Sequence, residues 1–312
     1  MRLFAYLNAD GPSIGVLDRA DRVTPLEGWA GGLDAALAED RFGELLADAG
    51  VLASDGPTLA FARPRHELDP LPAIEFPGKV VCVGLNYRDH VEEQHLELPP
   101  RPTLFAKFGN AVIGDGEPIV RPEGTSALDL EVELGVVISR PSWRVAAADA
   151  MDHVAGYVVV NDVTARDWQG NKAALRPGER GDGQWLRAKG SDTFLPIGPV
   201  FATVDEIPDP HALRLRSWRI PGSGQNAGRP LAMQDGTTAD MLWRIPELLA
   251  FVTAAITLQP GDILITGTPA GVGVFRDPPV FLEPGDRARC EVEGIGSVDN
   301  PVVDWMTVRD DA

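Results

Sequence analysis

Short apolar runs separated by turn residues are the dominant pattern along this chain. Residues 2–8 (RLFAYLN) and 14–18 (IGVLD) flank the turn sequence ADGPS, which predicts antiparallel strands within residues 1–26. Further apolar or alternating segments are typical of strands: residues 79–84, 129–139, 154–163, 262–268 and 288–296. The sequence therefore predicts a β-rich core.

Helical spacing of apolar residues is less frequent. Residues 31–50 carry leucine and phenylalanine at helical intervals, which predicts a helix or a helix pair that stops at Gly50. Residues 146–154 (AAADAMDHV) and 245–258 (IPELLAFVTAAITL) are further predicted helices, and Pro246 suits the first turn of the latter. We expect these helices at the periphery, so the predicted fold class is β-rich α+β.

A Pro-rich segment, residues 66–79 (HELDPLPAIEFPGK), follows the first helical region, and we expect a linker there. We place a boundary near residue 70, with a small α+β domain at residues 1–70 and a larger domain at residues 71–312. The chain has 312 residues, of which 44% are hydrophobic, and this is enough for a sizeable core.

The charge balance limits the partners. The formal net charge is −18, so nucleic acid and an anionic membrane surface would both repel the chain, whereas a small anionic substrate needs a local cation. No apolar run of about 18 residues predicts a membrane span. The first residues lack the apolar stretch of a signal peptide. Two cysteines make no disulfide framework, so we expect a cytoplasmic protein with a buried thiol at Cys82.

Acidic and apolar residues alternate in residues 129–134 (DLEVEL), which places the three acids on one face of a strand. Asp162 ends another hydrophobic run and is placed to project into a cleft. Three carboxylates that meet cannot all stay ionised, unless a hard cation such as Mg²⁺ binds their oxygens. We therefore predict a metal site at Glu131, Glu133 and Asp162. A solvated strand face is the alternative, because Glu-x-Glu pairs are common on surfaces.

A second group lies in VGLNYRDHVEE, residues 83–93. If a helix begins at Asp89, His90 and Glu93 lie three residues apart on one face. A carboxylate beside an imidazole fixes its tautomer and makes it a general base for a water molecule. The alternative is an ordinary surface helix that Asp89 caps.

Two further segments offer groups for an anionic substrate. Lys189, at an expected turn within residues 184–199, supplies a positive charge, although a solvated lysine is the alternative. In residues 261–273 (GDILITGTPAGVG), a strand runs into a Gly-rich turn whose backbone N–H groups can bind a carboxylate. We expect Gly267 and Thr268 to contribute there.

Together these segments resemble the fumarylacetoacetate hydrolase superfamily. The chain contains, in the family's order, VVCVGLNYRDHVEE, LFAKFGNAVIGDGEPI, DLEVELGVVIS, GYVVVNDVTARD, QWLRAKGSDTFLPIGP and DILITGTPAGVG. The resemblance covers about residues 75–300. It is strongest to the bacterial acylpyruvate hydrolase and 2-hydroxyhepta-2,4-diene-1,7-dioate isomerase branch, and residues 1–70 resemble the variable small domain of longer members.

The resemblance implies a roll of mixed β-sheets, assembled as a homodimer. It implies Mg²⁺ or Mn²⁺ on the acids that match Glu131, Glu133 and Asp162, and catalytic roles for the residues that match His90, Glu93 and Lys189. This chain differs from fumarylacetoacetase itself. That enzyme has an additional acidic ligand shortly before the histidine, whereas this chain has residues 83–86 (VGLN) there, with no acid. We therefore expect a three-carboxylate site.

The segment at residues 168–183 is long, polar and Gly-rich, as a mobile flap would be, and Arg176 or Arg180 is placed to reach a distal carboxylate. A solvated loop is equally consistent with its composition. Other candidates for the substrate-binding lining are these: Arg88, Asn110, Arg166, Gln184, Gly267 and Thr268.

We expect a metal-dependent hydrolase that cleaves a 2,4-diketo acid, an acylpyruvate or fumarylpyruvate, into pyruvate and a carboxylic acid. Metal charge stabilises an enolate, His90 activates water, and Lys189 stabilises the oxyanion. The alternatives are an oxaloacetate-type decarboxylase and a 2-hydroxyhepta-2,4-diene-1,7-dioate isomerase, which share the enolate. A non-catalytic dicarboxylate-binding protein is a remote alternative, because binding alone needs no water-activating pair.

Overall fold

The computed structural model describes residues 1–54, 61–170 and 182–309. Its strands are β1 (Arg2–Asn8), β2 (Gly11–Leu17), β3 (Arg22–Pro25), β4 (Arg63–Pro64), β5 (Asp69–Pro70), β6 (Val80–Gly84), β7 (Thr103–Lys107), β8 (Val112–Ile113), β9 (Ile119–Arg121), β10 (Leu128–Asp129), β11 (Val132–Ile138), β12 (Val154–Asn161), β13 (Thr164–Ala165), β14 (Leu195–Pro196), β15 (Val200–Thr203), β16 (Arg214–Ile220), β17 (Leu231–Thr237), β18 (Ile263–Ile265), β19 (Arg287–Val292) and β20 (Gly296–Asp304). The α-helices are α1 (Gly32–Ala38), α2 (Phe42–Ser54), α3 (Arg88–Glu93), α4 (Arg166–Gln169), α5 (Trp185–Gly190), α6 (Ile245–Thr253) and α7 (Trp305–Arg309).

One large mixed sheet organises the molecule. Its strand order is β4-β3-β2-β1-β15-β12-β11-β18-β6-β7, and β5 pairs with β1 beside this path. At its centre β11 pairs antiparallel with both β12 and β18, whereas β18 and β6 run parallel. Every residue of β11 and β12 is buried, because these continuous apolar runs are covered on both faces.

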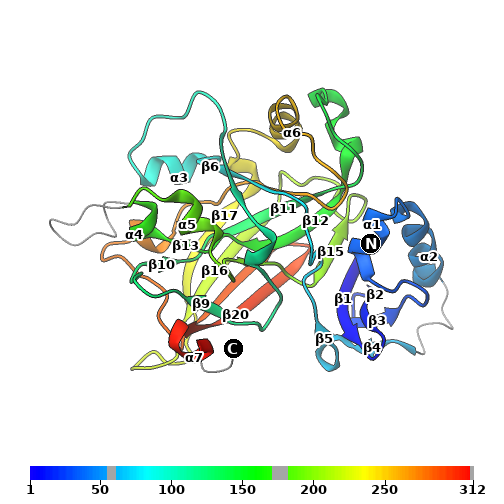
Figure 1. Cartoon of the computed structure of the whole chain (residues 1–312), viewed down its shortest axis with the longest axis horizontal. Coiled ribbons are helices and arrows are strands. Elements are labelled where there is room, and N and C mark those ends of the chain that lie inside the picture. The colour runs from blue at the N-terminus through cyan, green and yellow to red at the C-terminus, as the bar shows by residue number, and fades with distance from the viewer. Residues whose placement is uncertain (55–60, 171–181, 310–312) are drawn as a thin grey trace.

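A second sheet, in the order β17-β16-β19-β20-β9, packs against the first. Its strands β16, β19 and β20 contact β11 and β12, and the apolar core lies between these layers. Figure 1 shows the helices around the outside of this two-layer arrangement. The predicted β-rich roll with peripheral helices is therefore confirmed.

The amino-terminal strands continue the main sheet. β1, β2 and β3 form the antiparallel set expected within residues 1–26, and β1 pairs with β15. The helix pair α1 and α2 lies against these strands at one end of the molecule (Figure 1). The domain boundary near residue 70 stays a prediction.

Several predicted element bounds were wrong. Helix α2 passes through Gly50 and continues to Ser54, and α6 ends at Thr253 rather than near residue 258. The segment predicted as a helix at residues 146–154 forms a 3-10 helix, η4 (Ala147–His153). Within the expected linker, β5 pairs with β1. In each case tertiary contacts outweigh the local propensity.

The expected single strand at residues 129–139 is divided into β10 and β11. β10 pairs with β13, whereas β11 pairs with β12, so the chain changes partners between Asp129 and Val132. The interruption contains Glu131. Within the described ranges, none of the helices has the length and the apolar composition that crossing a membrane requires.

Candidate active site and metal centre

The paired central strands bring three carboxylates together. Glu131 directly precedes β11 and Glu133 is the second residue of this strand. Asp162 directly follows β12, where Asn161 is paired with Val132. The Asp162 backbone N–H also donates to the Glu131 carbonyl at 2.9 Å. Each residue offers one carboxylate oxygen, and these oxygens lie within 4.8 Å of one another. The three side chains could therefore hold a metal ion.

This acidic group is buried, so the solvated-face alternative does not apply. The exposed fractions of Glu131, Glu133 and Asp162 are 4%, 2% and 0%. Asp129, the other acid of the alternating run, is not part of the group. Its carboxylate accepts hydrogen bonds from Arg166 Nε at 2.9 Å and from the Gly273 backbone N–H at 2.8 Å.

Buried cations, among them Lys189 and Arg166, balance part of this charge. Lys189 Nζ lies 2.7 Å from Glu131 Oε2 and 2.6 Å from Asp162 Oδ2, and Arg166 Nη2 lies 2.5 Å from Glu131 Oε1. Burial alone would raise the pKa of Glu131, but Lys189 and Arg166 outweigh it and hold that pKa below its usual range. Burial likewise opposes the charge of Lys189, yet Asp162 and Glu131 raise the pKa of its amine.

Glu133 is the acid whose charge is not balanced. Burial, and then the carboxylates of Asp162 and Glu131, raise its pKa well above the usual range for glutamate. Three carboxylates in a buried site thus favour a protonated Glu133 unless a further cation binds. A hard divalent cation fits this donor set, because all three ligands are carboxylate oxygens.

The expected turn around Lys189 is instead helix α5, in which this lysine is buried with 2% exposure. The reason is tertiary: the short helix packs against α4 and β7 and directs the amine toward the carboxylates. The alternative of a solvated lysine is therefore excluded.

Helix α3 forms as expected and carries the predicted pair. His90 Nδ1 lies 2.6 Å from Glu93 Oε1, and since a carboxylate only accepts, the imidazole donates from Nδ1. The other ring nitrogen, Nε2, lies 2.9 Å from the amide nitrogen of Gln94, which donates to it. Phe275 contacts the imidazole edge-on, with ring centroids 5.9 Å apart. The histidine is thus held in one tautomer and one orientation.

The Gly-rich turn after β18 binds carboxylates of the protein itself. Gly267 N–H donates to Glu133 Oε2 at 2.5 Å, Gly271 N–H to Glu93 Oε2 at 2.9 Å, and Ala270 N–H to Asp89 Oδ2 at 3.2 Å. We expected the Gly267 amide to bind a substrate carboxylate, but in the structure it already holds Glu133. One turn therefore links the acidic group to the His90–Glu93 pair.

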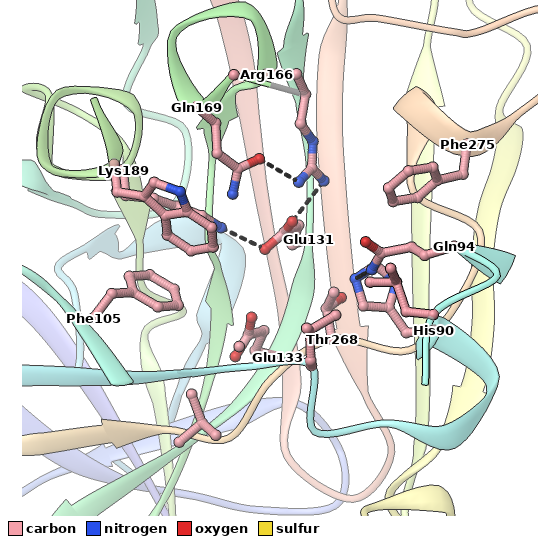
Figure 2. A pocket seen from close by; sticks show the side chains of 16 residues that line it. His90, Gln94, Phe105, Glu131, Glu133, Arg166, Gln169, Lys189, Thr268 and Phe275 are labelled. Carbon is pink, nitrogen blue, oxygen red and sulfur yellow. Dashed lines mark hydrogen bonds and ion pairs between the residues drawn. The ribbon is translucent and has the colours of Figure 1, made fainter. Parts of the chain in front are cut away.

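Four of the functional candidates line one cavity of about 330 Å³: His90, Glu131, Glu133 and Lys189. Figure 2 shows His90 and Gln94 on one side, Lys189 and Phe105 on the other, and Glu131 and Glu133 between them. The described residues that line it are Val83, Gly84, Leu85, His90, Gln94, Leu96, Phe105, Glu131, Glu133, Arg166, Gln169, Gly170, Trp185, Lys189, Thr268 and Phe275.

Residues 79–303 match the sequence model described as fumarylacetoacetate (FAA) hydrolase C-terminal. The chain belongs to this family. The resemblance in the sequence motifs is thereby confirmed. A mitochondrial oxaloacetate tautomerase of Bos taurus is 45% identical over 240 residues, which are 77% of this chain and 71% of that protein.

Two solved structures have a fold similar to that of this chain. A 2-hydroxyhepta-2,4-diene-1,7-dioate isomerase from Mycobacterium marinum has a TM-score of 0.71 and 32% identity, covering 98% of this chain and 99% of that one. A fumarylacetoacetate hydrolase from Exiguobacterium antarcticum has a TM-score of 0.78 and 29% identity, covering 97% of this chain and 99% of that one.

The remaining predicted substrate-binding residues have different positions. Thr268 lines the cavity, although its hydroxyl already bonds to Val132 and Gln234. Arg166 also lines it, with its guanidinium paired to Asp129 and Glu131. The cavity lining defined by the described residues does not include Arg88, Asn110, Gln184 or Gly267. Arg176 and Arg180 lie outside the described residues.

Sequence reasoning did not single out several lining residues of this family member. Gln94 is four residues after His90, and Gln169 is three after Arg166, whose Nη1 donates to it at 3.3 Å. Helical spacing from a predicted functional residue was the available signal for both glutamines. Phe105 had no comparable signal, because an aromatic residue in a strand usually packs in the core.

Proposed function

We propose that this chain is a metal-dependent isomerase that interconverts the enol and keto forms of a 2-oxo acid of the oxaloacetate type. One observation carries the proposal. His90, which is suited to proton transfer, and Lys189, which is suited to stabilising negative charge, lie on either side of the buried carboxylates in one cavity (Figure 2). The names of two relatives, an oxaloacetate tautomerase and a dienedioate isomerase, describe reactions that relocate protons. Hydrolysis, which we expected first, therefore becomes the second candidate.

We propose that Glu131, Glu133 and Asp162 hold Mg²⁺ or Mn²⁺. The support is the fit of the donor set: three buried carboxylates within 4.8 Å, of which Glu133 has a pKa raised by burial and by the other two acids. When bound, the ion supplies positive charge that stabilises the enolate form of a 2-oxo acid.

His90 and Lys189 have separate roles in the proposed reaction. In the keto direction, Nε2 of the neutral His90 imidazole takes the proton of the enol hydroxyl and then delivers it to C3 of the substrate, so no atom is added or lost overall. His90 exchanges the proton at C3 through Nε2, since Glu93 occupies Nδ1. Lys189, whose pKa Asp162 and Glu131 raise, stays cationic and stabilises the oxygen that carries the enolate charge.

Nε2 must be available for this exchange. In the structure Gln94 donates to it at 2.9 Å, so the amide must turn aside before the imidazole reaches the substrate.

The direct test uses purified protein, Mg²⁺ and freshly dissolved enol-oxaloacetate, with the loss of enol ultraviolet absorbance followed over time. We expect acceleration above the buffer rate that chelation by EDTA removes and Mg²⁺ restores. A rate equal to that of buffer, with the metal bound, would overturn the proposal.

The second candidate is hydrolytic C–C cleavage of an acylpyruvate or fumarylpyruvate. The His90–Glu93 contact of 2.6 Å favours it, because such a pair also activates water, and a neighbour of similar fold is named a fumarylacetoacetate hydrolase. NMR analysis of acetylpyruvate, fumarylpyruvate and oxaloacetate after incubation separates the outcomes. Pyruvate plus the matching acid indicates a hydrolase, whereas pyruvate and CO₂ from oxaloacetate alone indicate a decarboxylase.

We also propose that the substrate is a small anionic keto acid and that the chain acts as a homodimer, as the sequence resemblance implies. Light scattering on the purified protein at several concentrations tests the assembly. A monomer at every concentration would contradict it.

A further inference from the structure

Lys107 is a buried cation without a role in the reaction proposed above. It ends β7, within the motif LFAKFGNAVIGDGEPI, and its exposed fraction is 1%. Its ammonium group donates to three backbone carbonyls: Val163 at 3.0 Å, Phe194 at 2.7 Å, and Lys189. An ammonium group has three N–H donors, so its hydrogen-bonding capacity is fully used.

The same nitrogen forms an ion pair with the acidic group. Lys107 Nζ lies 2.7 Å from Asp162 Oδ1, and both side chains are buried with 0% exposure. The other carboxylate oxygen of Asp162, Oδ2, faces Lys189 at 2.6 Å. Lys107 therefore contacts one oxygen of Asp162 and the backbone of Lys189, while Asp162 and Lys189 contact each other. The three residues thus contact one another pairwise, and of the three it is Lys189 that lines the cavity.

We propose that Lys107 is a positioning residue for the metal centre. It pairs with Oδ1 of Asp162 and so leaves Oδ2, the oxygen on the side of Lys189, as the single ligand atom that Asp162 offers. It also fixes the carbonyl of Lys189, which places that amine between Glu131 and Asp162. The inference rests on the proposed metal site of these three acids.

A purely structural role is the competing explanation, because the three carbonyls belong to separate segments that Lys107 ties together. The two explanations differ in what they predict for metal binding. A structural lysine affects only the free energy of unfolding. A positioning lysine also affects the affinity for the ion, since groups that orient ligands contribute about 10- to 100-fold to metal affinity.

The chain offers a matched control in Lys79. Its Nζ lies 2.9 Å from Oδ2 of Asp262, another buried aspartate with 1% exposure. Asp262 accepts backbone hydrogen bonds from Lys79 and Gln259 and is not one of the three grouped acids. Lys79→Met thus removes a lysine–aspartate pair of the same chemistry away from the proposed metal.

The experiment compares the full-length protein with Lys107→Met and Lys79→Met, using Mn²⁺ as the probe and the paramagnetic resonance of free Mn²⁺ as the readout. We expect Lys107→Met to weaken Mn²⁺ binding by about 10- to 100-fold and Lys79→Met to leave it within about 2-fold. A folded Lys107→Met protein with unchanged Mn²⁺ affinity would overturn the inference. If the unaltered protein binds no Mn²⁺, the metal proposal itself fails first, and this inference fails with it.

A second measurement needs no substitution, in case Lys107→Met does not fold. In protein labelled with ¹⁵N at lysine side chains, Mg²⁺ addition should shift the buried Lys107 amine resonance, because the charge at Asp162 changes beside it. The Lys79 amine should not move. An unchanged Lys107 resonance at saturating Mg²⁺ would contradict the proposal.

Discussion

The backbone N–H of Gly267 donates a hydrogen bond of 2.5 Å to the carboxylate of Glu133. Four residues later in the same turn, Gly271 donates to Glu93 at 2.9 Å. A proposed metal ligand and the carboxylate that orients His90 are therefore positioned by one short piece of backbone. This coupling makes the turn a sensitive point for substitution.

Gly271→Ala should damage both stability and activity. Gly271 has a φ of +103°, and an added Cβ would lie 2.4 Å from the carbonyl oxygen of Met233. We expect the free energy of unfolding to fall by about 2–4 kcal/mol, and the catalytic rate to fall because Glu93 loses its position. Chemical denaturation and the tautomerase assay measure the two effects.

Gly116→Ala is the matched control for that substitution. Gly116 also has a positive φ, +85°, but an added Cβ meets no atom within 4 Å. Its backbone strain should cost about 1 kcal/mol, with activity unchanged. Equal losses in both variants would show that strain alone, and not the contact at Gly271, determines the effect.

Glu133→Gln should abolish tight metal binding. The substitution keeps the shape of the side chain but removes the charge of a proposed ligand, so the affinity for Mn²⁺ should fall by at least about 100-fold. Calorimetric titration measures it. Glu283→Gln is the control, because Glu283 is 55% exposed and pairs with Arg121. Undiminished affinity in Glu133→Gln would contradict the assignment of this ligand.

Metal binding should release a proton. Burial and the nearby carboxylates of Asp162 and Glu131 raise the pKa of Glu133. In the metal-free protein this side chain therefore keeps its proton at pH values above those at which glutamate usually loses it. A metal ligand must be deprotonated, and the affinity should therefore rise with pH. Titration of Mn²⁺ in two buffers with different ionisation enthalpies should give a difference equivalent to as much as about one proton.

The raised pKa of Glu133 also predicts the direction in which the stability of the metal-free protein changes with pH. Between the usual glutamate pKa and the raised one, the folded metal-free protein binds more protons than the unfolded chain. Its free energy of unfolding should therefore fall as the pH rises through this window, and bound metal should remove the effect. Denaturation curves with EDTA and with Mg²⁺ compare the two states. A pH slope that is the same in both would contradict the role of Glu133.

His90→Asn should lower the catalytic rate by about 10²- to 10⁴-fold while it leaves the affinity for metal nearly unchanged. The imidazole contacts Glu93 and Gln94 rather than the three grouped acids, which explains the separation of the two effects. His95→Asn is the control, since His95 is exposed in the same short segment. Tautomerisation that persists in His90→Asn would transfer the proton-exchange role to another group.

Much of the site was available from local pattern. The alternation of acids and apolar residues around Glu131 and Glu133 predicted a strand, and the hydrophobic run before Asp162 predicted a second strand; the structure pairs the two. The spacing of His90 and Glu93 predicted their contact on a helix, and α3 provides it. These inferences succeeded because strands and helices each impose a characteristic spacing of apolar and polar residues, which is visible within a short stretch of sequence.

The alternation alone left open whether the acidic face is solvated or buried, and which of its acids act together. Tertiary structure decided both points: both sides of β11 are covered, and Asp129 pairs with Arg166 and leaves the group. It also decided that Lys189 lies in a helix and faces the carboxylates, and that Lys107 lies behind Asp162.

The sequence by itself indicated several central strands, the helix that carries His90, the family resemblance and the three acids that the structure groups together. Only the tertiary structure decided which charges are balanced and which are not. The physical reason is distance along the chain: Gly267 and Glu133 are 134 positions apart, and Lys107 and the Lys189 carbonyl are 82 apart. Local periodicity records which face a side chain occupies, but the group that meets it across the core is set by how the sheets pack.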